Sequence, residues 1–205
     1  LHDSLAFLTE TIQPVASKQG IVFESNLEDT KGHIVMGDEH RLNSVLLNLL
    51  SNAVKFSKDG TVSLAVHKEV VGNKLKFTFV VEDDGIGVPL KKRDTIFNKF
   101  SQADDSTTRV YGGTGLGLPI AKHLTTLMGG KIDYMPSEKQ GSIFTVELAF
   151  DEASEEDLAS YYAQTARILK EKQEKKAEHR GALKDMKIML VDDNSFNQEV
   201  ALEYL

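Results

Sequence analysis

The sequence predicts an α/β fold, because patterns typical of helices and of strands share residues 1–150 of a chain of 205. Three stretches repeat apolar side chains three and four positions apart, as one face of an amphipathic helix does: 3–18, 39–56 and 116–127. Other stretches alternate apolar and polar residues or are short runs beside turn residues, as strands are: 21–25, 33–36, 61–69, 74–82, 131–135 and 142–150. We therefore expect one compact domain over residues 1–150.

The composition of the chain excludes several classes of protein. The chain is 40% hydrophobic and 27% charged, which is typical of soluble globular proteins, and its net charge of −7 argues against nucleic acid or an anionic membrane surface as the main partner. The chain has no cysteine, which excludes disulfides and thiolate metal sites. No apolar run is long enough to span a bilayer and no signal peptide opens the chain. We expect a cytoplasmic fragment that makes no direct membrane contact, whether or not its parent protein is membrane-anchored.

The first two predicted helices have distinct local signals. In the first helix the apolar positions are Leu5, Leu8, Ile12 and Val15. Pro14 has no backbone N–H, so we expect an interruption or kink there. The second helix follows Asp38, whose side chain can cap the helix N-terminus.

The second helix carries three polar residues that suggest a function. Its apolar stripe consists of Leu42, Val45, Leu46, Leu49, Ala53 and Phe56. Asn48, Asn52 and Lys55 follow the same periodicity and share another face of the helix. Asparagine is disfavoured inside helices, so two aligned asparagines favour a binding role. A solvated face that carries them by chance remains the alternative.

Two glycine clusters bracket a polar segment. The first, 83–87, follows the strand 74–82, so Asp83 stands at a strand end beside Gly85 and Gly87. A carboxylate there can accept a hydrogen bond from an exocyclic amine such as that of adenine. The second cluster, 112–117, opens the third helix, whose N–H groups favour phosphate. Neither cluster has the spacing of a P-loop or of a dinucleotide-binding loop, so a nucleotide site here is of another type.

Four motifs together resemble the sensor histidine kinases. Residues 48–56 resemble the N box of that family, 83–87 its first glycine box, 96–102 its F box and 113–118 its second glycine box. The motifs stand in the family's order and spacing, and the resemblance covers residues 1–150. It implies the Bergerat-type fold shared with gyrase, the Hsp90 chaperones and MutL: an α+β sandwich with a mixed sheet, helices on one face and a mobile ATP lid.

The resemblance also implies roles for individual residues. Asp83 would bind the adenine amine, Asn52 would coordinate Mg²⁺ with Asn48 nearby, and Lys55 would contact phosphate. Residues 90–111 would form the lid. The other residues that would contact ATP are Gly85, Gly87, Lys99, Gln102, Arg109, Gly113, Thr114, Gly115, Leu116 and Gly117.

Beyond residue 150 the composition changes. Residues 151–185 are rich in charge and are predicted to be a linker with helical tendency. Residues 186–205 begin with an apolar strand that ends in Asp192 and Asp193, and they resemble the start of a response-regulator receiver domain. Adjacent carboxylates repel each other unless a cation is bound, so the pair is a candidate Mg²⁺ site. The receiver's phosphoacceptor aspartate is expected farther downstream and is absent.

None of the six histidines stands in the sequence context of a phosphoacceptor. The sequence therefore predicts the catalytic part of a hybrid histidine kinase, which binds ATP and Mg²⁺ and donates the γ-phosphoryl group to a histidine outside this chain. The expected partners are the dimerisation helices of the same parent protein, which we expect to be a homodimer, and a downstream receiver domain or response regulator. Two alternatives stay open: an ATPase of the gyrase, Hsp90 or MutL type, and a non-catalytic module that binds nucleotide only to signal.

Overall fold

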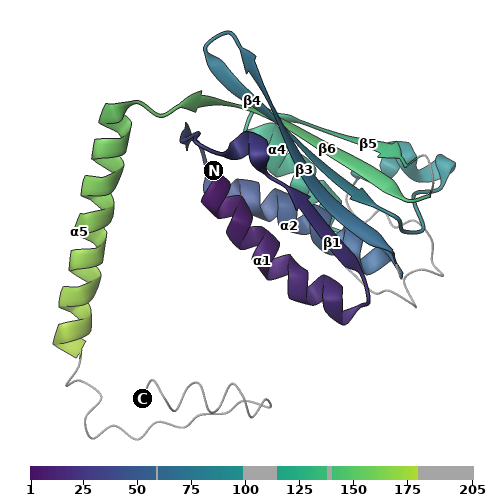
Figure 1. Ribbon diagram of the computed structural model, residues 1–205, viewed down its shortest axis with the longest axis horizontal. Coiled ribbons are helices and arrows are strands. Elements are labelled where there is room, and N and C mark those ends of the chain that lie inside the picture. The colour runs from purple at the N-terminus through teal and green to yellow at the C-terminus, as the bar shows by residue number, and fades with distance from the viewer. Residues whose placement is uncertain (59, 99–114, 138–139, 180–205) are drawn as a thin grey trace, which may run out of the picture. The chain divides into compact units, whose positions relative to one another are not determined.

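The computed structural model describes residues 1–58, 60–98, 115–137 and 140–179 (Figure 1). It forms two compact units, Leu1–Ala153 and Ser154–Leu205. The sheet and the helices that pack on it belong to the first unit. In the second unit the described part is helix α5, Glu155–His179. The predicted strand 186–191 and the candidate Mg²⁺ ligands Asp192 and Asp193 lie outside the described residues.

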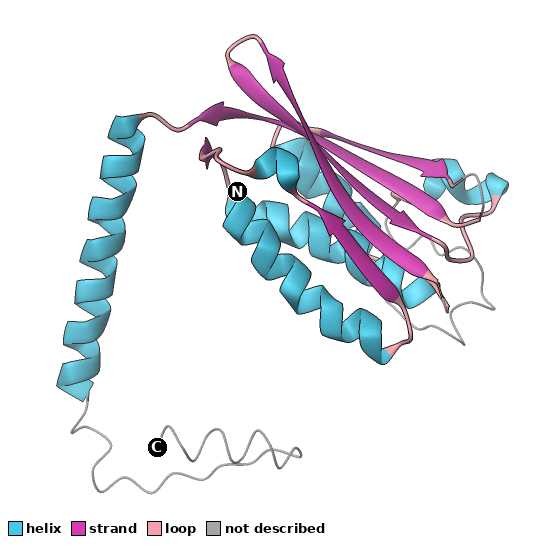
Figure 2. Cartoon of the chain, in the orientation of Figure 1, coloured by secondary structure: helices cyan, strands magenta, loops and turns pink. Residues whose placement is uncertain are grey.

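The first unit is built on a mixed sheet, which confirms the predicted α/β fold (Figure 2). Its strands are β1 (Val22–Asn26), β2 (Val35–Met36), β3 (Thr61–Val71), β4 (Lys74–Asp83), β5 (Lys131–Pro136) and β6 (Ser142–Glu152). The order is β1-β3-β4-β6-β2, with β5 also paired to β6. The β1–β3 pair is parallel and the other pairs are antiparallel.

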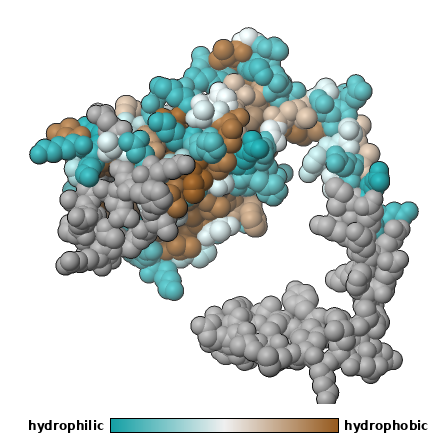
Figure 3. Space-filling model, turned by 180° about the vertical axis from the view of Figure 1, so that it is seen from behind, coloured by the Kyte–Doolittle hydropathy of each residue, from teal (hydrophilic) through white to brown (hydrophobic). Residues whose placement is uncertain are grey.

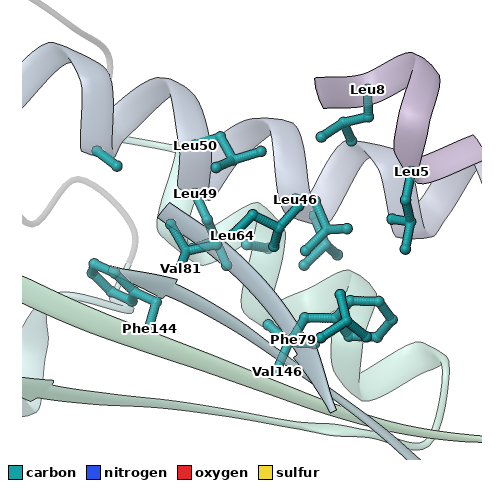
Figure 4. Packing of buried hydrophobic residues seen from close by; sticks show 14 of the residues in the cluster. Leu5, Leu8, Leu46, Leu49, Leu50, Leu64, Phe79, Val81, Phe144 and Val146 are labelled. Carbon is teal, nitrogen blue, oxygen red and sulfur yellow. The ribbon is translucent and has the colours of Figure 1, made fainter. Parts of the chain in front are cut away.

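The helices of the first unit are α1 (His2–Lys18), α2 (Glu39–Phe56) and α4 (Gly117–Leu127), and they lie on one face of the sheet (Figure 1). Two 3₁₀ helices, η1 (Glu28–Thr30) and η2 (Leu90–Thr95), lie in the connections. The core fills the space between the layers: leucines of α1 and α2, among them Leu5 and Leu46, face Phe79 and Val146 of the sheet (Figure 4).

Helix α2 begins and ends where the sequence predicts. The side chain of Asp38 accepts a hydrogen bond of 3.0 Å from the backbone N–H of Arg41, so it caps the helix as expected. The stripe residues from Leu42 to Ala53 are buried. This helix therefore holds Asn48 and Asn52 on a fixed element rather than on a loop.

Helix α1 differs from its prediction in two respects. It continues through Pro14 as one helix, so the expected interruption is wrong. The buried residue of its last turn is Ala16, whereas Val15 is exposed. The buried positions Leu5, Leu8, Ile12 and Ala16 recur every 3.7 residues on average, close to the helical period of about 3.6. Pro14 lies on the exposed side, away from these contacts.

Helix α4 turns part of its apolar stripe away from the core, although Leu124 still packs against it. Ile120 is 42% exposed and Leu127 is 55% exposed. The buried residues are the smaller Pro119, Ala121 and Thr125, and the Thr125 hydroxyl donates to the carbonyl of Ala121. Small residues let α4 lie close to α2. The periodicity predicted the helix but did not reveal which of its faces is buried.

The strand ends reflect pairing that the sequence did not reveal. β6 runs to Glu152, two residues past the expected end, because Asp151 and Glu152 pair with β2. The β3–β4 hairpin turns at Gly72, whose φ of 64° favours glycine.

In the second unit, helix α5 begins with reciprocal hydrogen bonds between Ser154 and Asp157. The Ser154 hydroxyl accepts from the N–H of Asp157, and the Asp157 carboxylate accepts from the N–H and the hydroxyl of Ser154. These bonds lower the pKa of Asp157.

Candidate nucleotide-binding site

Asp83 is a buried carboxyl group at the end of a central strand. Its side chain is 3% exposed and accepts a hydrogen bond of 2.9 Å from the backbone N–H of Gly85. Ser142, the first residue of β6, pairs with it across the sheet. Burial raises the pKa of Asp83 above its ordinary value, although hydrogen bonds from Gly85 and Ser142 oppose that rise. A buried carboxylate can accept a strong hydrogen bond from a ligand amine.

The loop after Asp83 requires glycine. A Cβ atom on Gly85 would lie 2.5 Å from the carbonyl oxygen of Phe56 and 2.7 Å from Oδ1 of Asp83. Gly87 has a φ of 67°, and its Cβ would lie 3.0 Å from the carbonyl oxygen of Gly141. Between them, Ile86 donates its N–H to the Phe56 carbonyl at 3.2 Å. The first glycine box is thus tied to the C-terminus of α2.

The asparagines of α2 meet the second glycine box. Gly117 begins α4, and a Cβ atom there would lie 3.0 Å from Oδ1 of Asn48 and 3.4 Å from Nδ2 of Asn52. Asn48 donates from Nδ2 to the Ser44 carbonyl at 2.7 Å, which fixes the orientation of its carboxamide. The N-terminus of α4 therefore lies beside the asparagine face of α2.

Lys55, Gly115 and Leu116 are further predicted site residues that the structure describes. The ammonium of Lys55 lies 4.9 Å from the ring centroid of Phe56, at the end of α2. Gly115 has a φ of 66° and, with Leu116, precedes α4. Several predicted ligands lie outside the described residues: Lys99, Gln102, Arg109, Gly113 and Thr114.

The described part of the predicted lid, residues 90–98, begins with the exposed Leu90 and is anchored near its end. Ile96 is buried, and the ring of Phe97 packs edge-on against Phe144, with 6.4 Å between the ring centroids. The ammonium of Lys122, from α4, lies 5.3 Å from the centroid of Phe97. Residues 99–111 lie outside the described part, so mobility of the lid stays a prediction.

Sequence reasoning missed three residues of this region. Ser142 faces Asp83 only because of strand register, and Tyr134 receives a hydrogen bond from the N–H of Val88 at 3.3 Å. Asp84 accepts from the N–H of Thr61 at 3.1 Å and thereby fixes the start of β3. For Asp84, its place inside the first glycine box was a signal. For the other two, pairing partners were needed.

The donor set fits Mg²⁺ bound together with a nucleotide. The carboxamide oxygen of Asn52 is a hard ligand of the type that Mg²⁺ accepts, and Mg²⁺ in such sites takes most other ligands from phosphates and water. Within the described ranges, no three His, Cys, Asp or Glu side chains are grouped as a metal site would need. In the same ranges, no helix is long and apolar enough to cross a membrane.

Comparisons with known proteins identify the family of this chain. The family described as histidine kinase-, DNA gyrase B-, and HSP90-like ATPase matches residues 37–152. The chain is 32% identical to the sensory/regulatory protein RpfC of Xanthomonas campestris over 98% of its own length and 29% of that protein. It is 35% identical to the sensor histidine kinase AruS of Pseudomonas aeruginosa, again over 98% of the chain but 18% of the relative. The chain thus spans less than a third of these relatives.

Solved structures of histidine kinases have a similar fold. Full-length ShkA in complex with AMPPNP superposes with a TM-score of 0.62 at 32% identity, over 75% of this chain and 30% of that one. The catalytic domain of the histidine kinase ThkA superposes with a TM-score of 0.55 at 26% identity, over 72% of this chain and 91% of that domain. The chain therefore belongs to the histidine kinase-, DNA gyrase B- and HSP90-like ATPase family, and it has the fold of a histidine kinase catalytic domain.

Proposed function

We propose that this chain binds ATP with Mg²⁺ and donates the γ-phosphoryl group to a histidine on a separate dimerisation and acceptor domain of its parent protein, as one step of a two-component phosphorelay. The observation that carries the proposal is the buried Asp83 at the end of β4, with the glycine loop folded against it. A family-level ATPase match and a relative bound to AMPPNP support the choice of an adenine nucleotide.

Asp83 recognises the base. Its carboxylate accepts a hydrogen bond from the exocyclic amine of adenine, and the bond is strong because Asp83 is 3% exposed. Guanine carries a carbonyl oxygen at the equivalent position, so an ionised Asp83 would repel it. Gly85 and Gly87 lie so close to their neighbours that a side chain at either position would meet protein atoms at 3.0 Å or less.

The asparagines and α4 handle the phosphates. Asn52 holds Mg²⁺ and Asn48 supports it, while Lys55 contacts a phosphate oxygen. The N-terminal N–H groups and the dipole of α4 favour the triphosphate, because Gly117 places them beside the asparagines. Mg²⁺ bound with the nucleotide supplies charge neutralisation for the transfer.

The nature of residue 48 favours transfer to a histidine over hydrolysis. Asn48 donates to the Ser44 carbonyl from Nδ2, and a carboxamide cannot take a proton from water. A gyrase-type ATPase uses a glutamate at the corresponding N-box position as its general base. The chain therefore has positioning groups for ATP but lacks that base, and we expect slow hydrolysis.

The exposed stripe of α4 supplies a surface for the acceptor helices. Ile120 and Leu127 are exposed, and Leu124, which is half-buried because it also packs against the core, lies between them on the same face. Figure 3 shows apolar side chains gathered in the middle of the face opposite to the view of Figure 1. An apolar helix face of this kind suits another amphipathic helix. Ile120 lies within one turn of Gly117, at the end of α4 that contacts the asparagines.

Calorimetric titration of the chain with ATP and GTP in the presence of Mg²⁺ tests the proposal. We expect ATP to bind at least about 10-fold more tightly than GTP, which corresponds to one lost hydrogen bond and one repulsive contact. ADP should compete with ATP. Equal affinities for ATP and GTP would refute the assignment of the base pocket to Asp83.

A further inference from the structure

Tyr134 of β5 makes a hydrogen bond to Val88, the residue that directly follows the first glycine box. Its hydroxyl accepts a hydrogen bond from the backbone N–H of Val88 at 3.3 Å. Val88 directly follows Gly87, whose φ of 67° turns the chain. Tyr134 is thus in direct contact with the loop beside Asp83, although it lies 46 residues away from Val88 in the sequence.

Three N–H groups of this loop donate to three different elements. Gly85 donates to Oδ1 of Asp83 on β4 at 2.9 Å, and Ile86 donates to the carbonyl of Phe56 on α2 at 3.2 Å. Val88 donates to Tyr134 on β5. The first two bonds fix the start of the loop, and the third fixes its end. Loss of the third bond leaves Gly87, the residue most able to rotate, as a pivot.

The ring of Tyr134 is itself held in place. It packs on Phe144 with 5.3 Å between the two ring centroids. The guanidinium carbon of Arg93 lies 5.9 Å from the centroid of the Tyr134 ring. Nε of Arg93 is buried and has no hydrogen-bond partner among the residues that the structure describes, so the ring face is the favourable contact of the guanidinium. These contacts hold the ring of Tyr134, and with it the hydroxyl, in one position. Through Arg93 the same ring also contacts η2.

Phe144 extends this contact to the helix after the lid. It packs against Phe97, and the ammonium of Lys122 lies over the ring of Phe97. The aromatic group formed by Phe97, Tyr134 and Phe144 thus connects the glycine loop and η2 on one side with α4 on the other. Tyr134 is the member that makes a hydrogen bond to the loop.

We propose that Tyr134 is a positioning residue for the nucleotide: its hydroxyl sets the backbone of Val88 and so the shape of the base pocket beside Asp83. This role rests on the proposed function. Tyr134 acts on binding, since it reaches the loop and neither Asn48 nor Asn52. Removal of the hydroxyl lowers the affinity for every adenine nucleotide to the same extent. The rate of phosphoryl transfer at saturating ATP stays unchanged.

The test is Tyr134→Phe, which removes the hydroxyl and keeps the ring. In the nucleotide-free chain, amide hydrogen exchange at Val88 should become faster, while exchange at Ile86, whose N–H binds Phe56, stays the same. Calorimetry should show ATP and ADP each bound about 2- to 10-fold more weakly, the worth of one neutral hydrogen bond. Transfer to the separate acceptor domain should show a raised KM for ATP with kcat within about 2-fold.

Tyr161→Phe in α5 is the matched control, because Tyr161 is an exposed tyrosine of the second unit and should leave all these values unchanged. Unchanged exchange at Val88 in Tyr134→Phe, or a fall in kcat without a change in KM, would overturn the positioning role. An unsubstituted chain that binds no nucleotide would instead refute the proposed function. The exchange measurement needs no nucleotide, so the two failures are distinguishable.

Discussion

Gly117 of α4 lies so close to Asn48 of α2 that a Cβ atom would be 3.0 Å from Oδ1 of the asparagine. This contact joins the second glycine box to the N box. It explains why the sequence spacing of these motifs can be wide while the groups that we propose to contact the phosphates lie together. Because the atom that a Cβ would meet belongs to a side chain, the helix can remain in place while Asn48 moves.

We expect Gly117→Ala to impair binding more than folding. The new methyl group displaces the carboxamide of Asn48 and touches that of Asn52, so affinity for ATP with Mg²⁺ should fall about 10-fold. Alanine is a better helix former than glycine, so thermal stability should change little. His123→Ala, on the exposed side of α4, is the control. A loss of stability that matches the loss of affinity would argue against a role of this contact in binding.

Gly85→Ala should have the opposite balance. Its Cβ would meet the carbonyl oxygen of Phe56 at 2.5 Å, and backbone atoms cannot move aside cheaply. We expect unfolding in urea to show a loss of about 1–3 kcal/mol, the usual cost of overpacking a well-filled site. Stability equal to that of the unsubstituted chain would mean that the loop can shift away from α2.

Asp83→Asn should weaken ATP binding by about 10- to 100-fold, since a charge-assisted hydrogen bond to the adenine amine becomes a neutral one. The substitution keeps the shape of the side chain and its acceptor for the Gly85 N–H. Calorimetry with ATP measures the effect, and Asp133→Asn, on the exposed surface of β5, is the control. An unchanged affinity would remove Asp83 from the base pocket.

The same substitution should make stability less dependent on pH. Because burial raises the pKa of Asp83, the folded chain binds a proton more tightly than the unfolded chain. The contribution of this carboxyl group to stability is therefore present at low pH and is lost as the pH rises through its folded pKa. Asp83→Asn should stabilise the empty chain at about pH 7 and lose that advantage at about pH 4. Urea unfolding at the two values checks this, and an advantage that grows as the pH falls would contradict it.

A charge on the α4 stripe should impair transfer without impairing nucleotide binding. Leu127→Asp places a carboxylate on the surface proposed for the acceptor helices, and desolvating it on docking is costly. Thr126→Asp, at the exposed residue that precedes Leu127 in the same helix, is the matched control. We expect transfer to the acceptor domain to fall about 10-fold or more in the first variant alone, with equal ATP affinity in both. Equal transfer rates would place the docking surface elsewhere.

The sequence predicted those parts of the fold that depend on local pattern. The bounds of α2, the Asp38 cap and the alternation along β4 follow from spacing and side-chain chemistry within a few residues. The orientation of α4 did not follow, because Ile120 and Leu127 have the spacing of a core stripe and yet the small residue Ala121 faces α2. Periodicity identifies a helix face, and tertiary packing decides where that face points.

The candidate site shows the same division. Asp83 and its glycines are neighbours in sequence, so a strand followed by turn residues sufficed to place them together. Ser142 and Tyr134 reach this region only through the pairing of β6 with β4 and β5. A hydrogen bond that spans 46 residues, such as the one between Val88 and Tyr134, leaves no local signal in the sequence.

Phosphoryl transfer is measured most directly with radiolabelled ATP. The label is followed on this chain alone and together with the separate acceptor domain of its parent protein, before and after acid treatment. We expect little ATP turnover and no label on this chain, and acid-labile label on the acceptor domain when both are present. Transfer should be weak, because two separate pieces lack the effective concentration of a linked protein. Asn52→Asp and Lys55→Ala should reduce it further. Rapid ATP hydrolysis by the chain alone, or acid-stable label on the chain itself, would contradict phosphoryl transfer to a histidine outside this chain.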